Sequence, residues 1–236
     1  KKTLYLCTQE FNFNNKLKIM KKLLIIAVCA VFALAANAQR PLDKKVSFSV
    51  GGGLNICGIA GDVDANSGVG FNAGAGVDFN IARNFGINSG LYLTLKGGSK
   101  TYTRINPQVV TADELSISSY YFQIPVLASG RIHLGNNVRW DINAGPYIAV
   151  GVFGKMKAKV SAAVKDEILY GETSYDTFGS ANNQLKRFDW GIAVGTKFNF
   201  RRWCIGIQYE HGLYDISNDN SKIRNWNVNT SAAFLF

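Results

Sequence analysis

Apolar and polar residues alternate along eight stretches of the chain. At 225–236, for example, Trp226, Val228 and Phe234 fall on one side of an extended backbone, while Asn227 and Asn229 fall on the other. The alternation recurs at 46–56, 69–81, 85–95, 120–128, 138–150, 188–198, 203–209 and 225–236. A period of two predicts β-strands, and no window after residue 38 has a helical period over a useful length.

The connections between these stretches fall into two length classes. Short ones lie near 82–84, 129–137 and 200–202, and long ones at 58–68, 96–115, 153–187 and 211–225. Short and long connections alternate, so each class gathers at one end of the sheet. Short periplasmic turns and longer outer loops are typical of outer-membrane barrels. The sequence therefore predicts an all-β fold, an eight-stranded antiparallel up-and-down transmembrane β-barrel.

The apolar face of such a barrel can point outward, or inward as in a soluble lipocalin-like barrel. None of the apolar-face positions in the eight stretches is charged, and a Lys or Arg at mid-bilayer costs about 2–4 kcal/mol on a lipid face. The opposite face carries mostly Gly, Asn and Ser. Eight strands enclose a lumen just wide enough for side chains, so the small polar face is expected inside and the bulky apolar face against lipid.

A targeting segment precedes the first strand. From Met20 the chain reads two lysines, an apolar run and the site Ala36-Asn37-Ala38, which is the build of a secretory signal peptide. We expect residues 1–19 to be upstream read-through, 20–38 the signal peptide, and 39–236 the barrel, exported to the outer membrane. Residues 1–38 hold six of the lysines and one glutamate, so their removal lowers the net charge from +10 to +5. The lower charge weakens the interpretation that the protein binds nucleic acid.

Aromatic residues gather at the predicted strand ends, where amphipathic rings favour the membrane interface. The set comprises Phe48, Trp140, Trp203 and Phe236 at the periplasmic interface, and Trp190 and Trp226 at the outer one. Two prolines, Pro125 and Pro146, fall inside strands. Because proline cannot donate to the ladder, the sequence predicts local bulges at both.

Charged residues on the inward face are of both signs: Asp78, Arg139, Asp141, Asp189, Lys197 and Glu210. Buried charges must be paired, so one interpretation is an ion-pair network that plugs the barrel. The alternative is a narrow pore lined by the same residues. The narrow lumen of eight strands favours the plug.

Candidates for catalysis and cofactor binding are few. Of the two histidines, His133 lies near a short turn and His211 lies near Glu210 and Asp215 at the outer rim. A hydrolytic site at that rim is the weaker interpretation, and we expect no enzyme activity, metal or cofactor. Cys57 and Cys204 belong to non-adjacent strands and are expected to stay free.

The connection at 153–187 is the best predicted interaction surface, because loops of this length in compact proteins are usually functional or disordered. Its candidate ligand residues are Lys155, Lys157, Lys159, Tyr170 and Tyr175. The basic run could contact the anionic head groups of lipopolysaccharide, and a solvated loop without a ligand is the alternative.

Several segments resemble the small, porin-like outer-membrane β-barrel family common in Bacteroidetes. They are "YYFQIPVLAS" (120–129), "NAGPYIAVGVFGK" (143–155), "FDWGIAVGTKF" (188–198) and "YEHGLYDIS" (209–217), with the terminal aromatic residue. Where such families usually have Glu before Ile-Pro, this chain has Gln123. The resemblance implies the fold and an outer-membrane location, and some relatives assist protein secretion.

Three functions therefore stay open from the sequence. The first is a structural or surface-binding barrel that contacts outer-membrane lipids. The second is a narrow channel for small solutes, and the third is an accessory to secretion with a partner outside the cell.

Overall fold

The computed structural model describes residues 44–61, 66–106, 109–135, 137–164, 167–181, 184–218 and 222–236. Between 100 and 113, and between 160 and 170, it describes only the backbone. The predicted signal peptide and the residues before it lie outside this part of the chain. Within it, no helix is long and apolar enough to cross a membrane.

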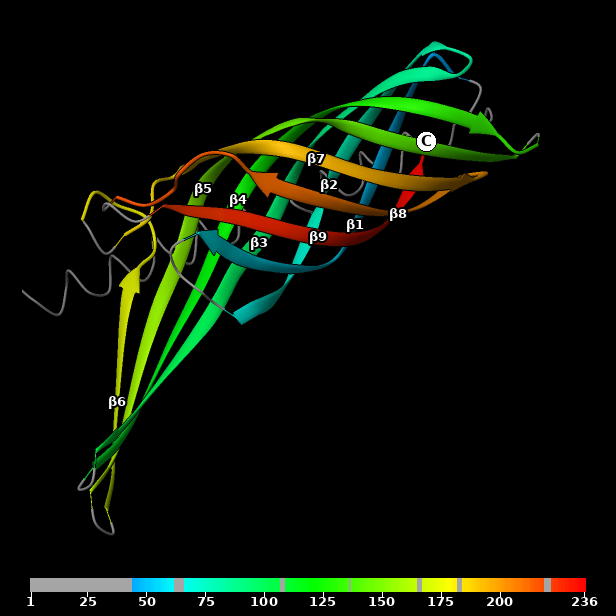
Figure 1. Cartoon of the computed structure of the whole chain (residues 1–236). Helices are drawn as coiled ribbons and strands as arrows, with labels where there is room; N and C mark the ends of the chain where they lie inside the picture. The colour runs from blue at the N-terminus through cyan, green and yellow to red at the C-terminus, as the bar shows by residue number, and fades with distance from the viewer. Residues whose placement is uncertain are drawn as a thin grey trace, which may run out of the picture. The chain divides into compact units, whose positions relative to one another are not determined.

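Nine antiparallel strands form the described part of the protein (Figure 1). They are β1 (Val46–Gly61), β2 (Asn66–Ala82), β3 (Phe85–Asn106), β4 (Val109–His133), β5 (Val138–Val164), β6 (Glu167–Asp176), β7 (Phe188–Phe200), β8 (Trp203–Gly212) and β9 (Ile223–Leu235). Eight of them pair in a ring, β1-β2-β3-β4-β5-β7-β8-β9, which β1 and β9 close. The predicted eight-stranded up-and-down barrel is confirmed, and β6 is an additional strand beside β5.

The seam between β1 and β9 depends on glycine. At Gly51 and Gly53 the two backbones approach so closely that a Cβ atom would collide with the carbonyl oxygens of Ala232 and Thr230. The pairing runs from Ser49 opposite Leu235 to Gly61 opposite Ile223. The alternation in the last stretch of the sequence is thus explained, because that stretch closes the ring.

The apolar side chains of the ring point outward. Along β4, Phe122, Ile124 and Val126 are 41–48% exposed, whereas Tyr121 and Gln123 between and beside them are at most 3% exposed. The same contrast follows the other strands, with polar residues buried in the lumen. The predicted orientation is confirmed.

The predicted short connections are confirmed at one end of the barrel, which we name the short-turn end. In the structure they comprise residues 83–84, 134–137 and 201–202. Arg201, in the last of these turns, has a φ of 53°. The opposite end is named the hairpin end.

The predicted long loops at 96–115 and 153–187 are largely wrong, because most of these residues form strands. β3, β4 and β5 contain 22, 25 and 27 residues, whereas about 9–11 suffice to cross a bilayer. Beyond the barrel their outer parts pair with one another and with β6, as Figure 1 shows. We name this four-stranded part, residues 97–106, 109–118, 155–164 and 167–176, the extension sheet.

The predicted bulges at Pro125 and Pro146 are also wrong. Pro125 lies opposite Tyr147 and Pro146 lies opposite Ile192, and the register is the same on both sides of each proline. A proline removes one ladder hydrogen bond, but losing that bond does not require an inserted residue. The register shift between β4 and β5 lies instead at Tyr120 and Tyr121.

A charge on the outward face at mid-height should destabilise the barrel strongly. Ile148 is 49% exposed, midway along the ring portion of β5, and we expect Ile148→Lys to lower the free energy of unfolding by about 2–4 kcal/mol. Denaturant unfolding in lipid vesicles measures this. The control is Phe153→Lys near the hairpin end, for which about 0–1 kcal/mol is expected. Equal costs at the two positions would contradict a lipid-facing surface centred near Ile148.

Candidate functional site

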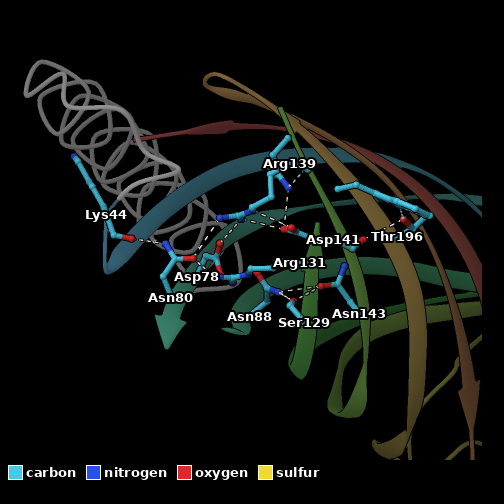
Figure 2. A network of polar contacts seen from close by, with 12 residues as sticks. Lys44, Asp78, Asn80, Asn88, Ser129, Arg131, Arg139, Asp141, Asn143 and Thr196 are labelled. Atoms are coloured by element: carbon cyan, nitrogen blue, oxygen red, sulfur yellow. Dashed lines mark hydrogen bonds and ion pairs between the residues drawn. The ribbon is translucent and has the colours of Figure 1, made fainter. Parts of the chain in front are cut away.

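An ion cluster lies in the lumen near the short-turn end (Figure 2). Arg139 donates from Nη2 to Asp78 Oδ2 at 2.7 Å and from Nε to Asp141 Oδ1 at 2.8 Å. Arg131 forms a second ion pair with Asp78, and both arginines donate to Asn80. All four charged residues are at most 8% exposed. Two cations balance two anions here, as burial of charge requires.

A neutral band continues this network along three adjacent strands of the lumen wall. Asn88 donates to Asn143 Oδ1 at 3.1 Å, and Ser129 hydrogen bonds to both residues. These side chains come from β3, β4 and β5, and Figure 2 shows them beside the ion cluster.

A second ion cluster lies nearer the hairpin end. Lys96 Nζ is 3.7 Å from Asp189 Oδ2 and 3.5 Å from Glu210 Oε2, and it stands 4.6 Å from the centre of the Tyr147 ring. Lys96, Asp189 and Glu210 are each at most 2% exposed. Since one cation faces two carboxylates, amides supply further donors. Those donating to Glu210 are Gln123 at 2.7 Å, Gln208 at 3.0 Å, and Asn227 and Asn229 at 3.2 Å.

Apolar residues cover this second cluster. Phe178, Leu185 and Ile216, from the connections on either side of β7 and β8, are at most 7% exposed and pack with Tyr121. The rings of Phe178 and Tyr121 meet edge to face at 5.4 Å. We name these three residues the apolar cap.

Asp215 holds the connection that carries Ile216. Its Oδ1 accepts from the backbone N–H of Ile223 at 3.0 Å and of Ser217 at 3.1 Å. Burial alone would raise the pKa of Asp215, but these two hydrogen bonds and the nearby Lys186 hold it below its usual value. The ionised form therefore favours the folded connection above the carboxyl's unfolded pKa, and this contribution is lost as pH falls through the lowered one.

A cavity of about 90 Å³ remains in the lumen. Asp141 and Glu210, one from each cluster, contribute to its wall, together with Lys197 and Asn72. Lys197 is half-buried and forms no ion pair with any residue the structure describes. A space of this size holds a few water molecules.

The structure thus divides the six predicted lumen charges. Asp78, Arg139 and Asp141 meet in the first cluster, Asp189 and Glu210 in the second, and Lys197 lies apart. The inward-facing charges predicted from the sequence did not include Arg131 or Lys96. Arg131 fell within the stretch interpreted as a turn, whereas β4 continues to His133. Because Arg131 lies two residues after the inward-facing Ser129, the alternation could have predicted that it also faces the lumen.

The predicted interfacial aromatics lie at the strand ends. Phe48, Trp140 and Trp203 lie near the first residues of β1, β5 and β8 at the short-turn end, and Trp190 and Trp226 near the first residues of β7 and β9. Trp140 stacks on Phe198 at 5.7 Å, and Trp203 contacts Phe234 at 5.3 Å. Phe236 directly follows β9.

The predicted ligand residues are divided between strands and faces of the extension sheet. Lys155, Lys157 and Lys159 are exposed along one face of β5, and Lys157 pairs with Glu172 at 3.1 Å. Tyr175 lies opposite Met156, on the other face, and is 51% exposed. Tyr170 lies on β6, opposite Ser161, and its side chain is outside the described part.

The residues around His211 do not form a hydrolytic arrangement. Glu210 points into the lumen toward Lys96, while His211 contacts Tyr209 through Nδ1 at 3.2 Å. Asp215 is engaged by backbone N–H groups, as described above. Cys57 and Cys204 form no disulfide within the described residues, which confirms that prediction.

The chain is similar to a protein family and to several solved structures. The family model described as "Outer membrane protein beta-barrel domain" matches residues 36–218. Solved structures with a similar fold include the attachment invasion locus protein Ail of Yersinia pestis, with 12% identity and a TM-score of 0.40 over 82% of this chain and 100% of that one. Neisserial surface protein A has 12% identity and a TM-score of 0.39 over 81% and 99%. No curated protein sequence matches this chain.

Removing the cation of the second cluster should destabilise the protein. We expect Lys96→Met to lower the free energy of unfolding by about 3–5 kcal/mol, because two buried carboxylates lose their partner. Adding Asp189→Asn and Glu210→Gln should restore part of the loss. The control Lys157→Met breaks an exposed pair and should cost about 0–1 kcal/mol. Denaturant unfolding in detergent measures all of these, and a cost for Lys96→Met no larger than the control's would contradict the assignment.

Proposed function

This chain belongs to the outer membrane protein β-barrel domain family, and from that premise we propose that it is a closed barrel that binds ligands through its extension sheet. It is an integral protein of the outer membrane. In such barrels the short turns face the periplasm, so the extension sheet stands outside the cell. The Ile124-Pro125 and Gly145-Pro146 segments support a place in the branch common in Bacteroidetes.

The filled lumen is the observation that carries this proposal. Two ion clusters and a neutral polar band lie in the lumen, the apolar cap covers the second cluster, and the remaining cavity holds only a few water molecules. Moving a solute through would require separating charges that are at most 8% exposed, and breaking a buried pair costs about 3–5 kcal/mol. These contacts favour a structural plug over a conducting pore.

The length of the extension sheet supports the binding role. Its β5 part, residues 155–164, has ten residues, and ten residues of strand span roughly 33 Å. A membrane anchor does not need this part, since about 9–11 residues per strand cross the bilayer. The proposed ligands are molecules met at the cell surface, among them the anionic head groups of lipopolysaccharide. We propose no catalytic step, because His211 and Glu210 point to opposite faces of β8.

A narrow channel is the second candidate, and the cavity beside Asp141 and Lys197 is the observation that favours it.

Conductance distinguishes the two functions. In a planar bilayer the purified barrel should give no discrete single-channel steps, because the lumen stays plugged. A conducting porin in the same bilayer is the positive control, and Lys159→Gln, outside the lumen, is the matched variant. Discrete steps that disappear in Asp141→Asn or Lys197→Gln would show that the lumen conducts and would reject the closed barrel.

A further inference from the structure

A β-bulge reverses the alternation of β5 where the barrel meets the extension sheet. Tyr120 pairs with Phe153, but Tyr121 pairs with Gly151, so Val152 is an extra residue on β5. Both Val152 and Phe153 are exposed, at 38% and 53%. Before the bulge the even-numbered residues of β5 face lipid, and after it the odd-numbered ones continue the same surface.

The bulge therefore places lysines directly above the lipid-facing surface. Lys155, Lys157 and Lys159 continue the row that Ile148 and Val150 begin, whereas Met156 turns to the other face and is 7% exposed. If β5 alternated regularly through Val152, Met156 and Ala158 would occupy the lysine positions.

Aromatic rings mark the depth at which this change occurs. Tyr120 stacks on Phe153 with 4.2 Å between ring centroids, and Phe71 meets Tyr120 edge to face at 6.2 Å. Aromatic girdles of barrels lie at the membrane interface, so the lysine row begins at the level of the lipid head groups.

The heights of the three lysines can be estimated from strand geometry. With a rise of about 3.3 Å per residue and a tilt of about 40°, the Cα atoms of Lys155, Lys157 and Lys159 stand roughly 5, 10 and 15 Å above Phe153. The head-group layer is about 5–7 Å thick on each side of the bilayer, and lysine side chains reach several ångströms along a surface. Lys155 and Lys157 therefore reach this layer, while Lys159 stands above it.

A hollow of about 520 Å³ lies at the foot of the lysine row. Its charged residues are Lys155, Lys157, Arg187 and Asp176, which gives an excess of two positive charges. Ser116 and Ser118 add hydroxyl groups from β4. Ammonium and hydroxyl groups are donors suited to phosphate oxygens.

Arg187 is fixed at the rim by the bulge itself. Its Nη1 donates to the carbonyl oxygens of Gly151 and Val152, each at 3.0 Å. Lys157, by contrast, is held by an ion pair with Glu172 in which both side chains are about half exposed. Such exposed pairs contribute about 0–1 kcal/mol, so a phosphate can compete for this lysine.

We propose that Lys155 and Lys157, with Ser116, Ser118 and Arg187, bind phosphate groups of anionic lipid in the outer leaflet. The proposal rests on the proposed binding role of the extension sheet and names its ligand class and its site. The occupant is a membrane lipid rather than a soluble polyanion, because the site continues the lipid-facing surface. A head group beside the barrel reaches it without leaving the bilayer.

Binding of fluorescent lipopolysaccharide to the purified full-length barrel in detergent tests the proposal. We expect the double variant Lys155→Gln/Lys157→Gln to bind at least about tenfold more weakly, since each lysine near an anionic surface contributes appreciably to binding. Lys155→Arg/Lys157→Arg should retain most of the affinity, and the matched control Lys159→Gln should lose less than about twofold. Circular dichroism establishes that each variant keeps its strands.

Two further arms identify the occupant. Dephosphorylated lipopolysaccharide should bind wild-type protein as weakly as the double Gln variant binds the intact lipid. Dextran sulfate, a soluble polyanion, should compete poorly. Equal affinity of wild type and double variant for the intact lipid overturns the site. If the protein prefers dextran sulfate to the lipid, the proposal that the occupant is a membrane lipid is rejected. Because conductance is measured separately, either result is distinguishable from failure of the closed barrel.

Discussion

Closure of the strand ring is the constraint on which the rest of this structure depends. Hydrocarbon offers no water to an unpaired N–H or C=O group, so a membrane sheet must pair its first strand with its last. Here β1 and β9 meet along Ser49–Gly61, and Gly51 and Gly53 permit the close approach. Closing after eight strands also fixes a narrow lumen, and the inward face must therefore be built from small or tightly paired side chains.

The ion clusters follow from that narrowness. Once Asp78, Asp189 and Glu210 face a space with little water, their charges need partners within a few ångströms. Arg131, Arg139 and Lys96 provide them from strands that do not pair with those of the carboxylates. In the second cluster, where carboxylates outnumber cations, side-chain amides donate hydrogen bonds to Glu210 and so supply the partners that the cation cannot. Charge in the lumen thus serves to hold the ring together, and the proposed binding role falls to the extension sheet.

Sequence reasoning succeeded where lipid imposes a contrast between the two faces of a strand. The alternation at 120–128 predicted the strand and its outward face, because a misplaced charged residue there is costly. It failed beyond the membrane. Neither face of the extension sheet contacts acyl chains, so 155–164 and 167–176 lack a strong apolar stripe and were interpreted as loop. Arg131 was lost for a related reason, since its strand runs past the apolar band into a stretch of turn-like residues.

The bulge at Val152 joins these two regimes. In a regular strand, every second residue points to the same face. When such a strand continues past the bilayer, the residues that follow the lipid-facing ones at every second position stay on that face. At Val152 the outward face changes from the even-numbered to the odd-numbered residues of β5. In the alternation of Lys with Met and Ala that follows, the lysines therefore form a basic row above the aromatic rings. The carbonyl groups of Gly151 and Val152 at this point accept from Arg187, a cation from the connection before β7. The bulge therefore decides which side chains of this sequence the strand presents at the level of the head groups, while the ring below it stays intact.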